Sequence, residues 1–192
     1  ELTAPFLLLD VAAFFIRFGS LRFEHWRRVF AYGRIILAAA AMLYVPTRVL
    51  IDTAWVQNST VDVRLKNLPG ELQDFRITLV GDIQVDRYTG ESEVAQVHRI
   101  VREQTPELLL SSGDVVTGGT DYLVAAEHVM CRMKGSLASI AVMGDHDQWS
   151  APDVIRAFQV RCGWTFLENE HTLLTRNDKS VLVTGITHIY SQ

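Results

Sequence analysis

The feature that most constrains this chain is a Gly-Asp pair that closes three separate apolar runs. The pairs are Gly81-Asp82, Gly113-Asp114 and Gly144-Asp145. One such pair alone is most often an ordinary turn, but three in succession indicate buried strands that end in the same way. The spacing is also regular, because 32 residues separate Asp82 from Asp114 and 32 separate Asp114 from His146. Each interval has room for one strand-helix unit.

The pattern between these pairs predicts alternating strands and helices. Strands are expected at 60–66, 75–80, 107–112, 137–143, 164–169 and 180–186, and helices at 92–104, 121–134 and 151–162. The first helix has an apolar stripe that includes Val94, Val97 and Val101. This alternation indicates an α/β domain with parallel strands.

Parallel strands bring their carboxyl ends to one edge of the sheet, where open α/β sheets bind ligands. Asp82, Asp114 and Asp145, with His146, are therefore expected to crowd into one small volume. Several carboxylates together are unfavourable unless a positive charge lies between them. A divalent metal would supply that charge, and oxygen ligands with a few imidazoles suit Mn, Fe, Zn or Mg.

The blocks "GDIQ", "SSGDVV" and "MGDHD" resemble those of the calcineurin-like metallophosphoesterases, in the same order. The resemblance covers about residues 60–190, and the lead-in "LPGELQDFRITLV" is similar to that of membrane-anchored bacterial members. It implies a partial metallophosphoesterase αββα sandwich, with residues 56–192 as the N-terminal part of the domain.

The resemblance implies four metal ligands. Asp82 matches the first aspartate, and Gln84 stands where the family usually has a histidine, so an amide oxygen replaces imidazole. Asp114 matches the aspartate that bridges two metals. Asp145 replaces an asparagine and keeps an oxygen ligand there. The implied cofactor is therefore a pair of divalent ions, Mn, Fe, Zn or Mg.

Two further residues match catalytic positions of the family. His146 matches the histidine that contacts the phosphoryl group or protonates the leaving oxygen, and Asp147 matches the aspartate that orients it. The resemblance thus implies hydrolysis of a phosphomonoester or phosphodiester by a metal-activated water, with His146 assisting departure of the leaving group.

The later Gly-His and Gly-His-x-His motifs of the family are not in this sequence. We expect a fragment that stops within the domain, which the start at Glu1 also favours. The alternative is a degenerate, weakly active or inactive member that acts as a membrane-bound binding or scaffold module, which Gln84 and Asp145 favour. A membrane interaction protein with an unrelated α/β domain ranks below both. The remaining histidines are expected to be structural or surface residues: His25, His98, His128, His171 and His188.

Residues 1–55 predict a membrane anchor with one or two transmembrane helices. The segment 29–51 is apolar and long enough to span a bilayer, and 3–16 is a shorter apolar run. A soluble helical hairpin and a cleaved signal peptide are the weaker alternatives. Residues 17–28 carry four arginines against one glutamate, so the positive-inside rule places them in the cytoplasm and the domain on the extracytoplasmic side.

The net charge and the number of cysteines limit the kinds of binding partner and cross-link that we expect. The net charge of −4 gives no reason to expect nucleic-acid binding. Cys131 and Cys162 are too few for a disulfide framework and are expected to be buried thiols. The expected partners are the membrane and a phosphoester substrate, for which the anchor suggests a lipid or envelope-derived molecule.

Overall fold

The computed structural model describes residues 23–186, apart from the side chains of 23–27, 53 and 54. The chain divides into two compact units, Glu1–Trp55 and Val56–Gln192. The apolar run 3–16 and His188 lie outside the described residues, so the expectations for them stay predictions.

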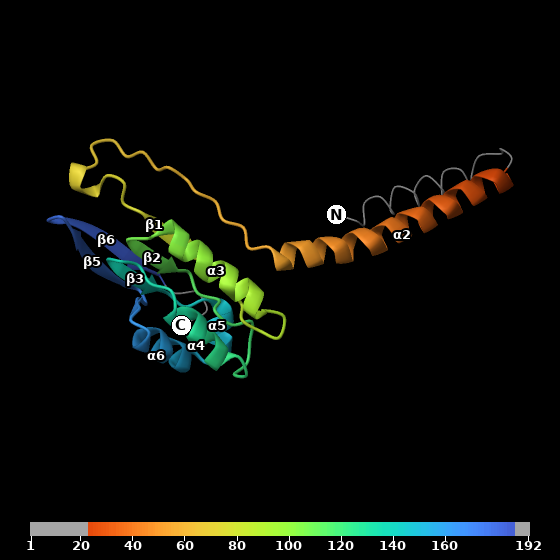
Figure 1. Ribbon diagram of the computed structural model, residues 1–192. Helices are drawn as coiled ribbons and strands as arrows, with labels where there is room; N and C mark the ends of the chain where they lie inside the picture. The colour runs from red at the N-terminus through yellow and green to blue at the C-terminus, as the bar shows by residue number, and fades with distance from the viewer. Residues whose placement is uncertain (1–22, 187–192) are drawn as a thin grey trace. The chain divides into compact units, whose positions relative to one another are not determined.

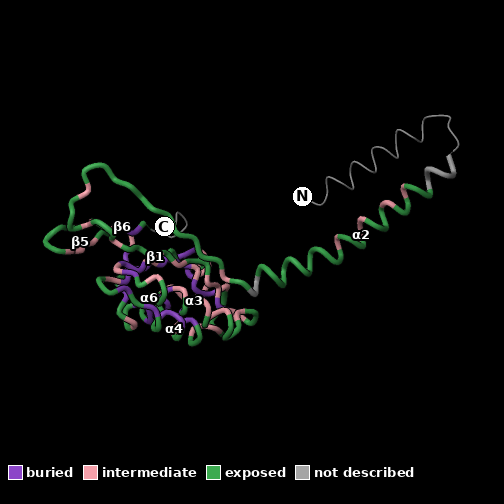
Figure 2. The backbone as a smooth tube through the Cα atoms, turned by 45° about the horizontal axis from the view of Figure 1, so that its top comes forward, coloured by how far each residue is buried: buried purple, intermediate pink, exposed green. Residues whose placement is uncertain are grey.

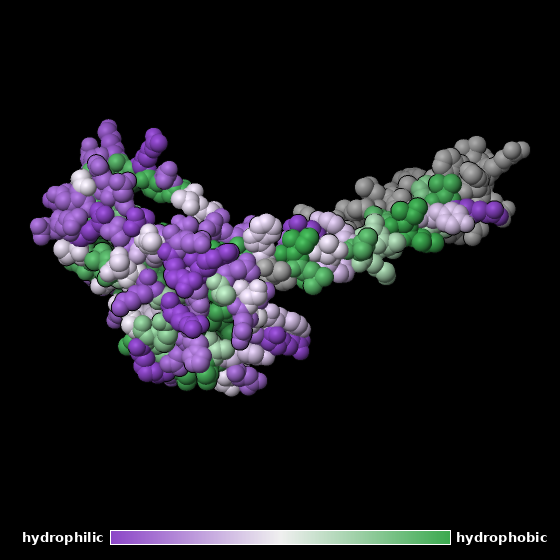
Figure 3. Space-filling model, in the orientation of Figure 1, coloured by the Kyte–Doolittle hydropathy of each residue, from purple (hydrophilic) through white to green (hydrophobic). Residues whose placement is uncertain are grey.

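Helix α2 (Phe23–Ala54) is the described element of the first unit. Its segment Arg28–Asp52 is apolar and, at 25 residues, long enough to cross a membrane, which agrees with the span predicted at 29–51. Figure 2 shows almost no buried backbone along α2, and Figure 3 shows apolar side chains along much of it. The helix begins at Phe23, so residues 23–28 are helical where a loop was expected.

Two polar side chains near the carboxyl end of α2 bond within the helix. Pro46 lies inside the helix and lacks an amide donor. The hydroxyl of the next residue, Thr47, donates to the Leu43 carbonyl at 2.7 Å. Arg48 pairs with Asp52 at 2.8 Å, so the two charges at this end offset each other.

The strand expected at 60–66 is wrong: residues 56–66 form no helix or strand. The alternation of apolar and polar residues is real, but Val61 and Val63 are 77% and 73% exposed. No described segment pairs with this stretch, and a strand needs a neighbour to take its backbone hydrogen bonds. A short 3-10 turn, η1 (Gly70–Leu72), then leads into the domain.

A four-stranded sheet forms the centre of the second unit (Figure 1). It consists of β1 (Ile77–Val80), β2 (Leu108–Ser111), β3 (Ala138–Ala141) and β4 (Thr165–Phe166). All neighbours are parallel and follow chain order. The predicted parallel α/β arrangement is therefore confirmed.

Helices connect these strands. They are α3 (Glu91–Gln104), α4 (Leu123–Cys131), α5 (Asp145–Ser150) and α6 (Pro152–Arg161). The sequence predicted three of them, whereas the short α5, which begins at the third Gly-Asp pair, was expected to be a polar strand end. Pro152 stands in the first turn of α6, where its missing amide costs no helical hydrogen bond.

The two faces of the sheet have separate cores. On one face Leu109 and Ala141 pack with residues of α3, α4 and α6, such as Val101, Met130 and Phe158. On the other face the alternate residues of the same strands, including Leu108 and Ile140, pack under a hairpin. This division follows from the two-residue period of strands.

The hairpin consists of β5 (Glu170–Arg176) and β6 (Lys179–Gly185), which pair antiparallel. Asn177 and Asp178 form its two-residue turn with φ of 46° and 64°. Asn and Asp tolerate this left-handed backbone, which two-residue hairpin turns require. The sequence prediction identified β6 but missed β5, although "RND" between two alternating runs is the signal for such a turn.

Cys131 and Cys162 form a disulfide, which corrects the expectation of two buried thiols. Cys131 is exposed and Cys162 half-buried, and their Cα atoms are 4.6 Å apart. The disulfide joins the end of α4 to the end of α6. The two cysteines are 31 residues apart in sequence, and only the packing of α4 against α6 brings them together.

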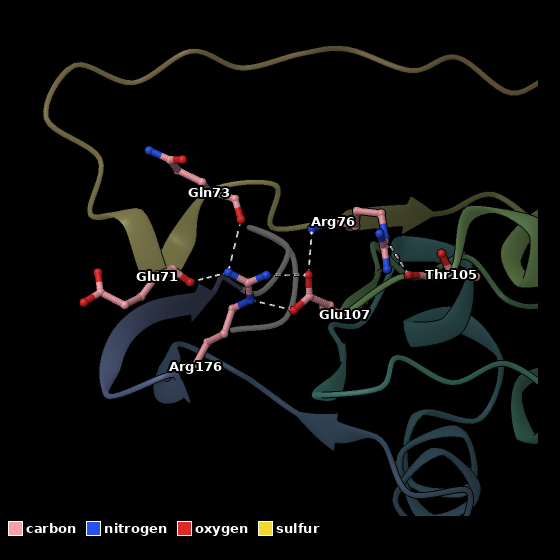
Figure 4. Close-up of polar contacts among 6 residues, drawn as sticks. All are labelled: Glu71, Gln73, Arg76, Thr105, Glu107 and Arg176. Carbon is pink, nitrogen blue, oxygen red and sulfur yellow. Dashed lines mark hydrogen bonds and ion pairs between the residues drawn. The ribbon is translucent and has the colours of Figure 1, made fainter.

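One ion pair connects the hairpin to the rest of the domain (Figure 4). The Arg176 guanidinium donates to both carboxylate oxygens of Glu107, at 2.6 and 3.1 Å, and also to the carbonyls of Glu71 and Gln73. These hydrogen bonds hold the pKa of Glu107 below its ordinary value, although partial burial raises it. The side chains are only 18% and 20% exposed, so water screens the pair weakly.

This ion pair makes part of the domain's stability dependent on pH. Since the pKa of Glu107 is lower in the folded chain, its contribution is complete above the ordinary carboxyl pKa and is lost as pH falls through the folded value. We expect Glu107→Gln to lower the thermal midpoint at pH 7 and to reduce the loss of stability on acidification. Thermal melts from pH 7 to pH 3 check this, and an unchanged acid dependence would contradict it.

Candidate active site

The loops that follow β1 and β2 have an unusual backbone. Asp82, Gln84 and Asp114 have φ of 52°, 46° and 55°. Residues other than glycine seldom occupy this left-handed region, and such strained residues concentrate at functional sites. Each lies just beyond the carboxyl end of a strand, where the sequence placed the candidate ligands.

Backbone hydrogen bonds hold the first two loops side by side. The Asp82 amide donates to the Gly113 carbonyl at 3.3 Å, and the Gln84 amide donates to the Asp114 carbonyl at 2.9 Å. Val85 and Val116 then form a parallel bridge that extends the pairing beyond the strands. The first and second Gly-Asp blocks are therefore adjacent, as predicted.

The third block joins them through Asp114. The His146 amide donates to Oδ1 of Asp114 at 3.0 Å and to Oδ1 of Asp145 at 3.1 Å. Gly144 allows this approach, because a Cβ there would lie 2.0 Å from Oδ1 of Asp114. A Cβ on Gly113 would lie 2.1 Å from the Gly144 amide nitrogen, so both glycines are required by close packing.

Asp114 lies where negative charge accumulates. Burial raises its pKa, and the neighbouring charges of Asp145 and Asp147 raise it further, against the opposing hydrogen bond from the His146 amide. No described cation forms an ion pair with Asp114. A group in this position gains from a positive ion placed beside it.

The His146 ring is fixed by the second loop. Its Nδ1 lies 2.5 Å from the Thr117 carbonyl, which can only accept, so Nδ1 carries the proton. That hydrogen bond raises the pKa of His146, and the charges of Asp114 and Asp145 act in the same direction. The Trp149 ring lies 5.5 Å away at 55°. Nε2 is then the ring atom left to meet a ligand.

Asp147 is fully buried and bonds to backbone amides. One carboxylate oxygen accepts from Val115 at 2.8 Å and from Val116 at 3.3 Å, and the other accepts from Gly144 at 3.3 Å. Burial raises the pKa of Asp147, and these amides partly offset the increase. We expected Asp147 to contact the His146 ring, but none of these hydrogen bonds joins the two side chains. Asp147 holds the second and third loops together, and the Thr117 carbonyl orients His146.

The sequence reasoning overlooked Asp86. Its carboxylate accepts from the amides of Tyr88 and Thr89 and from the Thr117 hydroxyl at 3.0 Å. These bonds lower its pKa, although burial opposes them. Because Thr117 also donates to the Gln84 carbonyl at 2.9 Å, Asp86 fixes the loop that carries both Gln84 and the His146 contact. An Asp three residues before Thr89 in "DRYTG" is a turn signal that could have identified it.

The donor set suits divalent ions in charge and chemistry. Asp82, Asp114 and Asp145 offer carboxylate oxygens and Gln84 an amide oxygen, and hard or borderline ions accept such ligands. The side chains of Asp82 and Gln84 make no hydrogen bond or ion pair within the described part of the chain. The residues present therefore fit a metal site.

The predicted acidic ligands are not drawn together around one point. Among the described residues, one group of three Asp, Glu, His or Cys side chains has its ligand atoms within 4.8 Å of one another. This group consists of Glu127, Cys131 and Cys162. The disulfide removes the thiolates that a metal would need there. The ligand atoms of Asp82, Asp114 and Asp145 therefore do not lie within that distance of one another, as the ligands of one ion would.

The histidines expected to be structural agree with that interpretation where they are described. His98 is buried in α3, and its Nε2 lies 3.0 Å from the Val129 carbonyl. His128 and His171 are exposed. None of the three lies beside the Gly-Asp loops.

An acidic site at the carboxyl edge of a parallel sheet, with a histidine fixed beside it, is typical of metal-dependent hydrolases. The family profile described as calcineurin-like phosphoesterase matches residues 75–187, more than half of the chain. The chain belongs to this family, whose members generally use a dinuclear metal centre.

Two curated relatives are similar to this chain. A "transmembrane protein with metallophosphoesterase domain" from Danio rerio is 27% identical over 122 residues, which is 62% of this chain and 28% of the relative. An "uncharacterized metallophosphoesterase" from Aquifex aeolicus (strain VF5) is 21% identical over 120 residues, 62% of this chain and 46% of the relative. The chain thus matches less than half the length of each relative.

The bonds of Asp147 predict a large loss of stability in Asp147→Asn. An amide has one acceptor oxygen where the carboxylate has two, so at least one buried N–H group loses its partner. We expect the free energy of unfolding to fall by about 2–4 kcal/mol. Asp145→Asn is the matched control and should change it by less than about 0.5 kcal/mol, since Asp145 is half-buried. Chemical denaturation followed by tryptophan fluorescence checks both, and equal effects would contradict the prediction.

Proposed function

We propose that this chain forms part of a membrane-anchored, metal-dependent phosphoesterase that hydrolyses a phosphomonoester or phosphodiester. The observation that carries the proposal is the adjacency of the loops that carry Asp82, Asp114, Asp145 and His146, at one edge of the sheet. The raised pKa of Asp114 supports it, because uncompensated negative charge is what a bound cation would relieve. The family and the acidic site point to the same class of reaction.

In this proposal Asp82, Gln84, Asp114 and Asp145 hold two divalent ions, which are Mn, Fe, Zn or Mg. When bound, such ions activate a water and neutralise charge on the phosphoryl group. His146 presents Nε2 to the substrate because Nδ1 is held by the Thr117 carbonyl. From there it contacts the phosphoryl group or gives a proton to the leaving oxygen. Asp147 keeps the loops of this site in register.

The membrane supplies the argument for the substrate. Helix α2 has the length and composition of a membrane span, and the Danio rerio relative is named a transmembrane protein. An enzyme held at a bilayer meets phosphoesters of lipids or of the cell envelope at high local concentration. We therefore propose a lipid or envelope-derived substrate.

The second candidate is a degenerate member that acts as a membrane-bound binding or scaffold module. Gln84 favours it, because an amide binds Zn or Fe more weakly than imidazole does. The separation of the predicted acidic ligands favours it as well.

Two observations support an extracytoplasmic position for the domain. Arg27 and Arg28 lie at the amino end of α2, whereas the other end carries one arginine, Arg48. The disulfide between Cys131 and Cys162 is independent of this argument, because disulfides persist mainly in oxidising compartments.

Activity tests the main proposal directly. Full-length protein loaded with Mn should hydrolyse p-nitrophenyl phosphate or bis(p-nitrophenyl) phosphate. His146→Ala should lower kcat by about 10²–10⁴, as expected for loss of a proton-transfer group. The matched control His128→Ala, at an exposed position of α4, should keep the activity.

Metal content separates the two candidates further. We expect about two ions per chain by elemental analysis, since a dinuclear centre is proposed. Gln84→His should raise metal affinity if Gln84 is a ligand. Equal inactivity of wild type and His146→Ala, with no gain in metal or activity from Gln84→His, would favour the scaffold.

The disulfide provides a test of which side of the membrane the domain occupies. In intact cells, a membrane-impermeant maleimide should label Cys131 and Cys162 only after treatment with a membrane-impermeant reductant. A Cys131→Ser/Cys162→Ser variant should stay unlabelled. Labelling that appears only after the cells are permeabilised would place the domain in the cytoplasm and contradict the proposed topology.

A further inference from the structure

A basic pocket of about 540 Å³ lies on the other side of the domain from the acidic site. Four cationic side chains line it, those of Arg76, Arg102, Arg132 and Lys134, and the lining has no acidic residue. The volume lies within the range of small-molecule sites, about 300–1,000 Å³.

The position of the pocket separates it from the Gly-Asp loops. It is formed where α3 ends and β2 begins, around Thr105 and Pro106, and where α4 leads into β3, around Gly135 and Ser136. These are the amino ends of strands whose carboxyl ends carry the acidic site. Strands of four residues put about 13 Å of sheet between the two edges.

The positive charge in this pocket is largely uncompensated. Arg102, Arg132 and Lys134 make no ion pair or side-chain hydrogen bond within the described part of the chain. Arg76 donates through Nε to the Thr105 carbonyl at 2.9 Å. Glu107 accepts from the Arg76 amide at 3.4 Å and its charge interacts with Arg76, but both its carboxylate oxygens bind Arg176 (Figure 4).

The ends of the two helices account for only part of this charge. Helix carboxyl ends attract cations, and each is equivalent to about −0.5 elementary charge. The ends of α3 and α4 together therefore offset about one positive charge of the four. Helix capping alone leaves several cations without a counter-charge in one concave site.

The walls of the pocket are preformed. The Ser136 amide donates to the Pro106 carbonyl at 3.0 Å, and the Leu137 amide donates to the Glu107 carbonyl at 2.8 Å. A Cβ on Gly135 would lie 2.2 Å from the Ala138 carbonyl oxygen, so backbone packs directly on backbone there. The hydroxyls of Thr105 and Ser136 make no hydrogen bond within the described residues and can donate to a ligand.

We propose that this pocket is a second ligand site, which binds a phosphate group of a soluble phosphate compound or of a lipid headgroup. Arginine binds phosphate oxygens in pairs, lysine adds a point charge, and hydroxyls complete the oxygens' hydrogen bonds. The site is distinct from the proposed active site, so it holds a phosphate compound without hydrolysing it.

The small number of lysines in the sequence allows a test that is specific for this pocket. The chain has three lysines, Lys66, Lys134 and Lys179, all exposed, and only Lys134 lines the pocket. The full chain is treated with a lysine-acylating reagent, and the rate at each lysine is measured by mass spectrometry. Bound phosphate should protect Lys134 while Lys66 and Lys179 react as before.

Two arms distinguish the sources of phosphate. In detergent micelles the probe is inorganic pyrophosphate, compared with sodium chloride at equal ionic strength. In nanodiscs the probe is phosphatidic acid in phosphatidylcholine, compared with phosphatidylcholine alone. With either probe at about ten times its dissociation constant, acylation of Lys134 should slow about tenfold. Protection by pyrophosphate alone identifies a soluble compound, and protection by phosphatidic acid alone identifies a lipid headgroup.

Arg132→Ala should abolish the protection, and Arg99→Ala should retain it. Arg99 is the matched control because it is an exposed arginine on α3 that does not line the pocket. Unchanged Lys134 acylation in both arms would overturn the proposal. Equal slowing at all three lysines would also overturn it, since that result indicates general screening. Both outcomes are read on the wild-type chain and do not depend on the folding of a variant.

Discussion

The buried carboxylate of Asp147 is the interaction on which the acidic edge of this domain depends. It accepts from amides of the loops after β2 and β3, and it has no access to water. It joins the loop that carries Asp114 to the turn that carries His146, and the bonds of the His146 amide to Asp114 and of the His146 ring to Thr117 reinforce this connection. The left-handed backbone at Asp114 persists because this anchor, together with Gly113 and Gly144, over-determines it.

The two ends of the parallel sheet carry opposite charge. Carboxylates gather where the strands end, and arginines and a lysine gather where β2 and β3 begin. Within each cluster, side chains of like charge repel one another. A bound ion or ligand of the opposite charge therefore stabilises each cluster. The same topology therefore builds one edge suited to cations and another suited to anions. The ion pair of Glu107 with Arg176 engages both oxygens of the carboxylate that also bonds the Arg76 amide at the basic edge.

Much of this arrangement could be read from the sequence, because strand periodicity and chain order determine which residues meet. The Gly-Asp pairs predicted the sheet edge that joins Asp82, Asp114 and Asp145, and the run 29–51 predicted the apolar helix. The partners of Asp147 could not be foreseen, since buried amides compete with the His146 ring for its carboxylate. The disulfide depends on how α4 packs on α6, and the segment 60–66 has the pattern of a strand without a partner. The basic pocket combines distant residues, Arg76 and Lys134, that no local motif connects.

The uncovered part of the sheet has a consequence for the behaviour of the domain in solution. Ile77 and Leu79 of β1 are 53% and 67% exposed, on the face where the hairpin covers only β2 and β3. The cross-strand pair Leu173 and Leu182 adds apolar surface on the outer side of the hairpin. Exposed edge strands with apolar faces readily pair with other chains. Aggregation of the folded domain, rather than its unfolding, therefore limits the concentration at which residues 56–192 stay in solution without a bilayer or a covering segment.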